Sequence, residues 1–535
     1  MTDRRSNPEN ESGDGAPLRP DETPYSDSGK EEMVVGPTTI TPAKMADDER
    51  FKTGRLAGLS MWSAIFILAW PVIIESMLNS LVGLVDTKLS AGLEDGVAAT
   101  DAIGGASYIM WLMGLVFMAL GVGATALISR SIGKGRVGVA NVVLGQTLTL
   151  SMISGVVVGI LVWVLAPGVT VLLKMTPEAT VLFTEYMRII AIGVPAASVL
   201  FSLIACSRGA GDSVSPMKVM IVRNIFNMVI SWACSGVEIF GMVSPLGLDW
   251  GVSGIALGTI LGDLAGALFI LHKARSGTWG IQLKAIRMRP HTHTVIRLVK
   301  LGIPNFMETF GLWVGNFFII AFVGLLGAQM ATEGLLGAHI IGIRIEAFSF
   351  MPGFGVGMAA ATLAGQYLGI GRPDLAKKAV WRCTLIAAGM MGFFGILLMV
   401  FPWQITAMLS TQPIHLQEVP SLLVVCGVVQ IPFAVGIVLR AAMRGAGDVK
   451  VVMALTWTAT YGVRLPLAYF LSGVDIPIPD FLGGGMVMNP DLPMQWFGLE
   501  PGLTMLWIAL CSDMVIRAVF FAMRFFQGGW VKAKV

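Results

Sequence analysis

The chain has 535 residues, of which 55% are hydrophobic and only 13% are charged, whereas soluble domains carry about 25% charged residues. Its mean hydropathy is +0.74 and its formal net charge is +3, a balance that does not suggest a nucleic-acid-binding protein. These totals exclude an ordinary soluble domain and indicate a protein that crosses a membrane many times.

The N-terminal segment differs from the rest of the chain. Residues 1–55 are rich in Ser, Pro and Glu and hold too little apolar surface to fold alone, so we expect a disordered cytoplasmic tail. Near the start there is no short apolar core followed by a small-residue cleavage site. We therefore expect no cleaved signal peptide and a first helix that is retained in the membrane.

Twelve apolar stretches come after this segment, each of about 20 residues or more and therefore long enough to cross a bilayer as a helix. We predict an all-α polytopic membrane protein with twelve transmembrane helices. Their approximate spans are 61–89, 104–130, 139–166, 179–208, 215–237, 251–273, 299–327, 335–366, 378–402, 420–444, 450–472 and 502–526.

The loops between these stretches indicate the orientation. With a cytoplasmic N-terminus, the inner loops hold about 21 Lys and Arg residues and the outer loops about one, Lys174. The opposite orientation violates the positive-inside rule at nearly every loop. We expect a multi-pass protein of the cell membrane (inner or plasma membrane) with both termini in the cytoplasm.

The two halves of the chain repeat one another. The sequence Arg-Gly-Ala-Gly-Asp at residues 208–212 recurs at 444–448, and Gly-x-Gly-Arg at 133–136 recurs at 369–372. Each half would hold six crossings, an even number, so the halves enter from the same side and form a parallel repeat. We predict two six-helix pseudo-symmetric lobes around a central cleft. The predicted divisions after the tail are an N-terminal lobe (56–273), a basic cytoplasmic linker (274–298), a C-terminal lobe (299–527) and a short cytoplasmic tail (528–535).

The repeated Arg-Gly-Ala-Gly-Asp sequence invites comparison with a phosphate-binding turn, but it lies after a helix, whereas a nucleotide-binding turn lies after a strand. A glycine after a helix favours a left-handed cap, and this is the interpretation we adopt. Arg208 and Arg444 would then anchor the helix ends at the cytoplasmic interface.

Four carboxylates lie in the predicted helices without a basic residue one turn away: Glu75, Asp86, Asp263 and Glu308. A charge at the centre of a membrane helix costs about 2.5 to 3.5 kcal/mol, so each needs a reason to be there. Such carboxylates can exchange a proton or bind Na⁺ through their oxygens. Structural hydrogen bonding is the alternative for Glu75 and Glu308, and a solvated interfacial charge is the alternative for Asp86.

Other intramembrane charges favour structural roles. Asp513 with Arg517 and Glu185 with Arg188 have the spacing of pairs on one helix face. Arg223 and Arg440, which lack a local acid, would snorkel, pair across helices or line the cleft. Polar side chains expected in the substrate cleft are Asn79, Asn316, Ser231 and His339, although a histidine in the position of His339 is more often a satisfied core residue.

Several short sequences together resemble the MATE (multidrug and toxic compound extrusion) family over roughly residues 60–527. They are Val-Asp-Thr at 85–87, the twin Arg-Gly-Ala-Gly-Asp sequences, Ala-His-Ile-Ile at 338–341 and Gly-Gln-x-x-Gly-x-Gly at 365–371. The resemblance implies an antiporter, driven by H⁺ or Na⁺, that exports organic cations and other amphipathic compounds by rocking two lobes.

The same resemblance assigns expected roles in the N-terminal lobe. Asp86 matches the family's first-helix aspartate, a proton or Na⁺ site, and Asn227 and Thr259 match residues near that site in DinF-like members. An Na⁺ ion would lie at Asp86 and Asn227. Ser231 stands where DinF-like members often have aspartate, and Asp263, where glutamine is common, would supply the missing acid. The Pro-x-x-x-Glu sequences that end at Glu75 and Glu308 resemble a different bacterial subgroup.

We therefore expect a secondary active efflux transporter in which a cation at Glu75, Asp86 and Asp263 competes with the exported compound, while Glu308 supplies negative charge in the other lobe. The alternative is a flippase for a lipid-linked precursor, with a cationic cleft formed by Arg223, Arg344 and Arg440. We expect no enzyme activity and no cofactor besides the coupling H⁺ or Na⁺. The expected partners of a monomeric protein are a small organic substrate and membrane lipid, and not nucleic acid.

Overall fold

The structure is a computed structural model of the chain, which falls into residues 1–48 and a much larger unit, residues 49–535. It describes residues 50, 54–93, 96–172, 175–238, 244, 246, 248–477, 484–498 and 500–533. Most of the predicted tail (1–55) lies outside the described residues. The helices and the candidate site all belong to the larger unit.

Long helices form the first half of this unit, as predicted. Each predicted crossing lies within or close to one of them. Most of the helices extend beyond the predicted spans, because an apolar stretch does not mark where a helix ends, whereas α6 ends two residues before its predicted limit. The helices are α2 (Met61–Ala91), α3 (Gly96–Gly133), α4 (Val137–Leu172), α5 (Pro177–Gly209), α6 (Val214–Ser235) and α7 (Gly251–Ser276).

The second half repeats this order with more interruptions. A short 3₁₀ turn, η1 (Ala285–Met288), precedes α8, which begins inside the predicted linker. The elements after this turn are α8 (Thr292–Gln329), α9 (Leu335–Ile370), α10 (Pro373–Val400), α11 (Pro402–Leu409), α12 (Pro413–Val428), α13 (Gln430–Ala446), α14 (Val449–Ala459), the π-helix η2 (Thr460–Arg464), α15 (Leu465–Ser472), β1 (Ile476–Pro477), β2 (Met486–Val487), α16 (Leu492–Phe497), α17 (Leu503–Gln527) and η4 (Gly529–Lys532).

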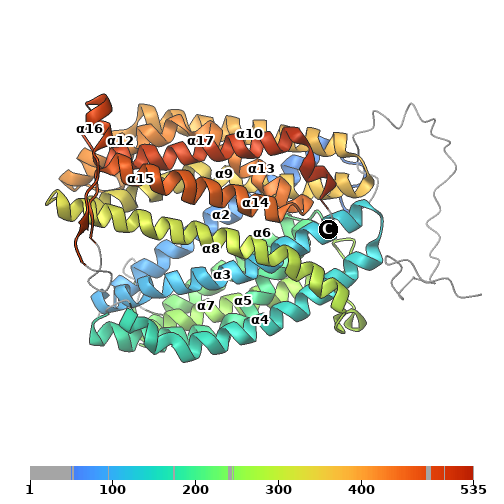
Figure 1. Ribbon diagram of the computed structural model, residues 1–535. Coiled ribbons are helices and arrows are strands. Elements are labelled where there is room, and N and C mark those ends of the chain that lie inside the picture. The colour runs from blue at the N-terminus through green and yellow to red at the C-terminus, as the bar shows by residue number, and fades with distance from the viewer. Residues whose placement is uncertain are drawn as a thin grey trace, which may run out of the picture. The chain divides into compact units, whose positions relative to one another are not determined.

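Ten helices of the described chain are long and apolar enough to cross a membrane, and α12 with α13 makes an eleventh that is bent by 58°. The predicted crossing at 450–472 is present as α14, η2 and α15 in succession, where a π-helical segment interrupts the α-helix. In Figure 1, α4, α5 and α7 lie on one side of the bundle and α10, α12 and α17 on the other. The all-α polytopic architecture in two lobes is confirmed.

The repeated Arg-Gly-Ala-Gly-Asp sequences have the same structure in both halves. Their second glycines, Gly211 and Gly447, have φ angles of 90° and 92°, as a left-handed cap requires. Their first glycines allow close helix packing: a Cβ on Gly209 would lie 3.0 Å from Thr125 Cα, and one on Gly445 would lie 2.6 Å from Ala361 Cα. The left-handed caps predicted from the sequence are confirmed.

The two lobes touch where the Gly-x-Gly-Arg sequences meet. A Cβ on Gly133, at the end of α3, would lie 2.2 Å from the carbonyl oxygen of Gln366, and one on Gly369 would lie 2.8 Å from Gly133 Cα. The backbones of α3 and α9 are therefore in direct contact, which only glycine permits. We call this contact between Gly133 and Gly369 the glycine crossing.

The C-terminal segment lies at the same end of the bundle as the glycine crossing. Arg130 Nη1 donates to the carbonyl oxygens of Ala533 at 2.6 Å and Ala446 at 3.4 Å, so an arginine of the N-terminal lobe holds two backbone groups from the second half. Trp530 is fully buried and stacks on Phe525, with ring centroids 5.5 Å apart. The predicted short tail (528–535) therefore folds back onto the bundle as far as Ala533.

Candidate functional site

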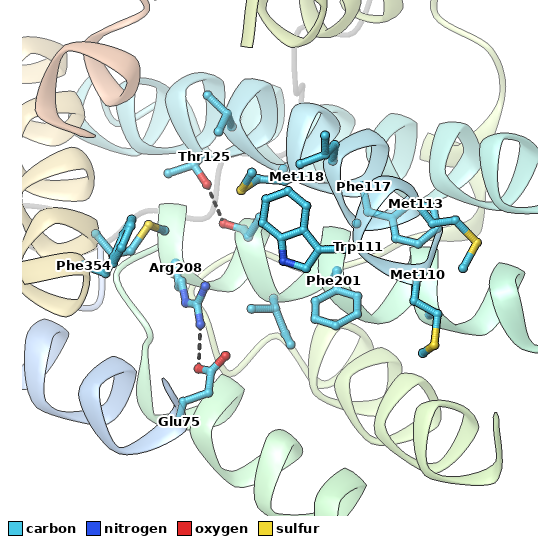
Figure 2. Close-up of a pocket in the computed structure, with 18 of the residues that line it drawn as sticks. Glu75, Met110, Trp111, Met113, Phe117, Met118, Thr125, Phe201, Arg208 and Phe354 are labelled. Atoms are coloured by element: carbon cyan, nitrogen blue, oxygen red, sulfur yellow. Dashed lines mark hydrogen bonds and ion pairs between the residues drawn. The ribbon is translucent and has the colours of Figure 1, made fainter. Parts of the chain in front are cut away.

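A cavity of about 770 Å³ lies between the halves of the chain, lined by residues of α2, α3, α5, α6, α7, α9 and α13. Its volume suits a drug-sized ligand. Most of its wall is apolar, and Figure 2 shows Trp111 in the midst of the aromatic and methionine side chains. The aromatic and methionine residues of the wall are Met110, Trp111, Met113, Phe117, Met118, Phe201, Phe354 and Met358.

Glu75 lies on the cavity wall and is paired with an arginine of another helix. Arg208 Nη2 donates to Glu75 Oε2 at 2.5 Å, and both side chains are largely buried (Figure 2). Arg208 belongs to the last turn of α5, and the prediction that it anchors this helix at the interface is wrong. It turns inward because the buried carboxylate of Glu75 requires a charged partner.

Glu308 forms the equivalent interaction in the second half, with two arginines. Its Oε1 accepts from Arg440 Nε at 2.6 Å and Thr456 Oγ1 at 2.8 Å, and its Oε2 accepts from Arg444 Nε at 3.0 Å and Nη2 at 2.6 Å. Glu308 is fully buried behind Arg440 and Arg444, which line the cavity. Both carboxylate oxygens are saturated with donors, and Arg444 is not the interfacial anchor that was predicted.

Asp263 pairs with Arg223, and both residues line the cavity. Arg223 Nε donates to Asp263 Oδ1 at 2.6 Å, and its Nη1 donates to Asn224 Oδ1 at 3.2 Å. Of the outcomes that the sequence left open for Arg223 and Arg440, both pairing across helices and lining the cleft are realised.

Asp86, on α2, has an unused acceptor. Its Oδ1 is buried and has no hydrogen-bond partner among the described residues, and the same is true of Asn227 Oδ1. The amide of Asn227 donates to Thr259 Oγ1 at 3.0 Å. Tyr186 lies beside Thr259 and within electrostatic reach of Asp86 and Arg223. Two buried acceptors without donors, on α2 and α6, are what a proton or a metal cation would satisfy.

The other predicted cleft residues whose side chains the structure describes lie outside the cavity wall. Ser231 is buried and donates to the carbonyl oxygen of Ile255 at 3.3 Å. His339 of α9 is 1% exposed, accepts from Trp507 Nε1 at 2.9 Å and packs against α17, so the structure gives it the position of a satisfied core histidine. Asn316 is half-buried on α8 and is not among the residues that line the cavity. Asn79 belongs to α2, but its side chain lies outside the described part of the structure.

Of the two pairs predicted within one helix, that of Asp513 with Arg517 is confirmed. Glu185 and Arg188 bind other groups instead: Glu185 accepts from the Ser253 hydroxyl, and the Arg188 guanidinium lies over the Trp163 ring, 5.7 Å from its centroid. Tertiary packing offers these side chains closer partners than their helical neighbours.

Sequence reasoning missed Tyr186 and the inward orientation of Arg208 and Arg444. A signal for the two arginines was present, because a repeated arginine accompanies a repeated glutamate in each half. Nothing in the local sequence of Tyr186 distinguishes it from other helical aromatic residues. Across the described residues, no group of three or more His, Cys, Asp or Glu side chains is placed to hold a metal ion.

Long apolar helices form two repeated halves, and the cavity between them has a mostly apolar wall that also carries charged side chains. These features define a polytopic membrane transporter. The MatE family model matches residues 71–233 and 304–470, more than half of the chain. The chain belongs to the MATE family of transporters.

Curated relatives share about a quarter of their residues with the chain. The probable multidrug resistance protein NorM of Thermotoga maritima is 27% identical over 414 residues, which cover 76% of this chain and 84% of the relative. The multidrug resistance protein PmpM of Pseudomonas aeruginosa is 27% identical over 408 residues, which cover 76% and 83%. An outward-facing structure of a multidrug resistance MATE transporter has a TM-score of 0.75 at 20% identity, covering 88% of this chain and 97% of that one, so it supports the fold.

Proposed function

We propose that this protein is a secondary active efflux transporter that exchanges H⁺ or Na⁺ for an amphipathic organic compound. The observation that carries the proposal is the pair of unused buried acceptors, Asp86 Oδ1 and Asn227 Oδ1. The amide of Asn227 donates to Thr259, which lines the large apolar cavity. Relatives named as multidrug resistance proteins support an exported, drug-like substrate.

The coupling cation binds at Asp86, Asn227 and Thr259 in this proposal. Glu308 is a poor candidate, because each of its oxygens already accepts two hydrogen bonds. Glu75 and Asp263 each have an arginine partner and serve instead to hold Arg208 and Arg223 in the cavity wall. A proton would require the carboxylate of Asp86 alone, whereas Na⁺ would use the side-chain oxygens of Asn227 and Thr259 as well.

The two lobes alternate between two arrangements, and the glycine crossing belongs to the arrangement seen here. In it α3 and α9 are in contact at the end of the bundle that the charge pattern assigns to the cytoplasm. Transport requires this contact to open, so that a rocking motion of the lobes makes the cavity accessible from the cytoplasmic side. The cation and the substrate favour different arrangements, and this difference couples their movements.

The test is efflux from proteoliposomes that hold an H⁺ gradient or an Na⁺ gradient, each imposed separately. One cationic dye, ethidium, and one anionic dye, pyrenebutyrate, are compared so that the result does not depend on substrate charge. We expect gradient-driven efflux of at least one dye in the wild type and its loss in Asp86→Asn. Asp374→Asn, which changes an exposed carboxylate of α10, is the matched control. Efflux that survives in Asp86→Asn would contradict the coupling site.

The lipid flippase is the second candidate, and one observation favours it. Arg223 and Arg440 line the cavity, as recognition of a lipid pyrophosphate would require, although Arg344 is exposed on α9 and does not. Movement of a fluorescent polyprenyl pyrophosphate between leaflets, without efflux of either dye, would favour the flippase over the efflux transporter.

A further inference from the structure

The cavity wall carries more positive than negative side chains. Four arginines line it (Arg208, Arg223, Arg440 and Arg444), whereas only two of the lining residues are carboxylates (Glu75 and Asp263). Arg208 and Arg223 are each balanced by one of these carboxylates. The other two arginines are not balanced by any carboxylate on the wall.

Arg440 and Arg444 share a single counter-ion, Glu308, which lies behind them. Among the residues that the structure describes, Glu308 is the one carboxylate that forms an ion pair with either arginine. Two guanidinium groups and one carboxylate leave a surplus of one positive charge at this part of the cavity wall. A charge in such a low-dielectric surface is costly unless a ligand or water compensates it.

The guanidinium groups also have unused donors. Arg440 contacts Glu308 through Nε, and its two terminal nitrogens have no acceptor in the part of the chain that the structure describes. Arg444 uses Nε and Nη2, which leaves Nη1 without an acceptor among the same residues. The side chains of Arg440 and Arg444 are 19% and 15% exposed, and the space that they face is the cavity.

The rest of the wall is apolar. Trp111 lies amid methionine and phenylalanine side chains of α3 and α5 (Figure 2). Phe354 and Met358 of α9 also line the cavity. Aromatic faces and flexible thioethers fit apolar bodies of varied shape. The cavity therefore offers a cationic subsite on α13 together with an extended apolar surface.

We propose that Arg440 and Arg444 bind the head group of an anionic amphiphile, a compound with one carboxylate, sulfonate or phosphate group and an apolar, aromatic body. Planar guanidinium groups bind such oxyanions through paired hydrogen bonds. This inference rests on the proposed transport function and specifies its substrate class. The head-group subsite lies on α13 of the C-terminal lobe, whereas the proposed cation site lies on helices of the N-terminal lobe.

The experiment measures binding of three pyrene probes with the same apolar body. Pyrenebutyrate carries a negative head, pyrenebutanol a neutral head and a pyrenyl trimethylammonium a positive head. Energy transfer from protein tryptophan to pyrene reports binding to the purified full chain in nanodiscs of zwitterionic lipid. We expect pyrenebutyrate to bind about tenfold more tightly than either other probe, as a charge-assisted contact predicts.

Single substitutions test whether Arg440 produces the preference for pyrenebutyrate. Arg440→Gln should remove most of the preference for pyrenebutyrate, whereas Arg440→Lys should keep only part of it, because the charge remains but the paired hydrogen bonds of the guanidinium group are lost. Arg344→Gln, which changes an exposed arginine of α9 outside the cavity, is the matched control and should bind like the wild type. Equal or tighter binding of the cationic probe by the wild type would overturn the proposal without any variant. An equal effect of Arg440→Gln and Arg344→Gln would also overturn it.

A final comparison distinguishes a soluble anion from a lipid head group. It also distinguishes failure of this inference from failure of the proposed transport function. In nanodiscs that contain phosphatidylglycerol, an unchanged affinity for pyrenebutyrate indicates a soluble anionic substrate, and a loss of affinity indicates that a lipid head group occupies the same subsite. Gradient-driven efflux of ethidium without a preference for the anionic probe would refute the inference and keep the transport function. Anion preference without gradient-dependent efflux of either dye would refute the transport function and keep the subsite.

Discussion

Arg444 holds Glu308 with two hydrogen bonds to the same oxygen, from Nε to Oε2 at 3.0 Å and from Nη2 to Oε2 at 2.6 Å, across 136 residues of sequence. Arg208 holds Glu75 across 133 residues in the other half. In each lobe, the arginine of the Arg-Gly-Ala-Gly-Asp sequence is therefore the partner of the glutamate of the Pro-x-x-x-Glu sequence. The two repeated sequences act together.

We expect Glu308→Gln to be among the most destabilising single changes in the described chain. It leaves the buried guanidinium groups of Arg440 and Arg444 without a counter-ion, and breaking a buried pair in this way costs about 3–5 kcal/mol. Thr456→Val removes only one hydrogen bond to the same carboxylate and should cost about 1 kcal/mol. Thermal unfolding in a mild detergent, followed by tryptophan fluorescence, compares the two. Similar losses of thermal stability in both variants would show that Glu308 does not neutralise the arginines.

The pair formed by Arg223 and Asp263 should behave as one unit. We expect Arg223→Gln and Asp263→Asn each to lower the unfolding free energy, and the double variant to lose less than the sum by about 0.5–3 kcal/mol, because neither charge is then left alone. The combination of Arg223→Gln with Asp448→Asn, whose partner is Arg524, is the control and should be additive. Additive losses at Arg223 and Asp263 would mean that their contact contributes nothing to stability.

Trp111 should contribute strongly to substrate affinity. Its ring lies on the cavity wall and is only 3.8 Å, centroid to centroid, from that of Trp313. We expect Trp111→Ala to weaken binding of an aromatic probe about tenfold and Trp111→Phe to weaken it less, because part of the aromatic contact remains. Trp403→Ala, which changes an exposed residue of α11, is the control in the same fluorescence titration. Unchanged affinity in Trp111→Ala would place the ligand elsewhere.

A methyl group at the glycine crossing should separate the lobes at that end. Gly133→Ala places a Cβ 2.2 Å from the Gln366 carbonyl oxygen, a distance that forces the backbones apart, whereas Gly138→Ala meets no atom within 4 Å and is the control. Spin labels on cysteines at Val137 and Asp374 report the separation, and the five native cysteines are buried and therefore poorly labelled. We expect longer distances in Gly133→Ala alone. An unchanged distance distribution would show that the contact can relax locally.

The architecture was predictable because long apolar stretches, loop charges and the 236-residue repeat each reflect a constraint that acts along the chain itself. The pairing of Glu75 with Arg208 was not predictable, because sequence spacing relates a buried charge only to the residues one turn away on its own helix. Helix packing places them on different helices instead. The position of His339 illustrates the opposite error: a histidine that matches a family motif was expected in the cleft, but its hydrogen bond with Trp507 lies in the core of the C-terminal lobe.

The unused acceptor of Asp86 could not be predicted from the sequence either. Whether a carboxylate in a membrane helix is satisfied depends on which donors the neighbouring helices present, and the resemblance to other transporters supplied only the position of Asp86. In the structure, the carboxylate of Glu308 accepts four hydrogen bonds, whereas Asp86 Oδ1 accepts none from the described residues.

Gly133 and Gly369 occupy equivalent positions of the two repeats, so the glycine crossing joins a residue to its own counterpart. A contact of this kind lies on the axis that relates the halves and is self-complementary, as in an isologous dimer. A six-helix protein of half this length could make the same contact with a second copy of itself. The crossing therefore has the form that an ancestral homodimer would leave behind after its gene was duplicated and fused.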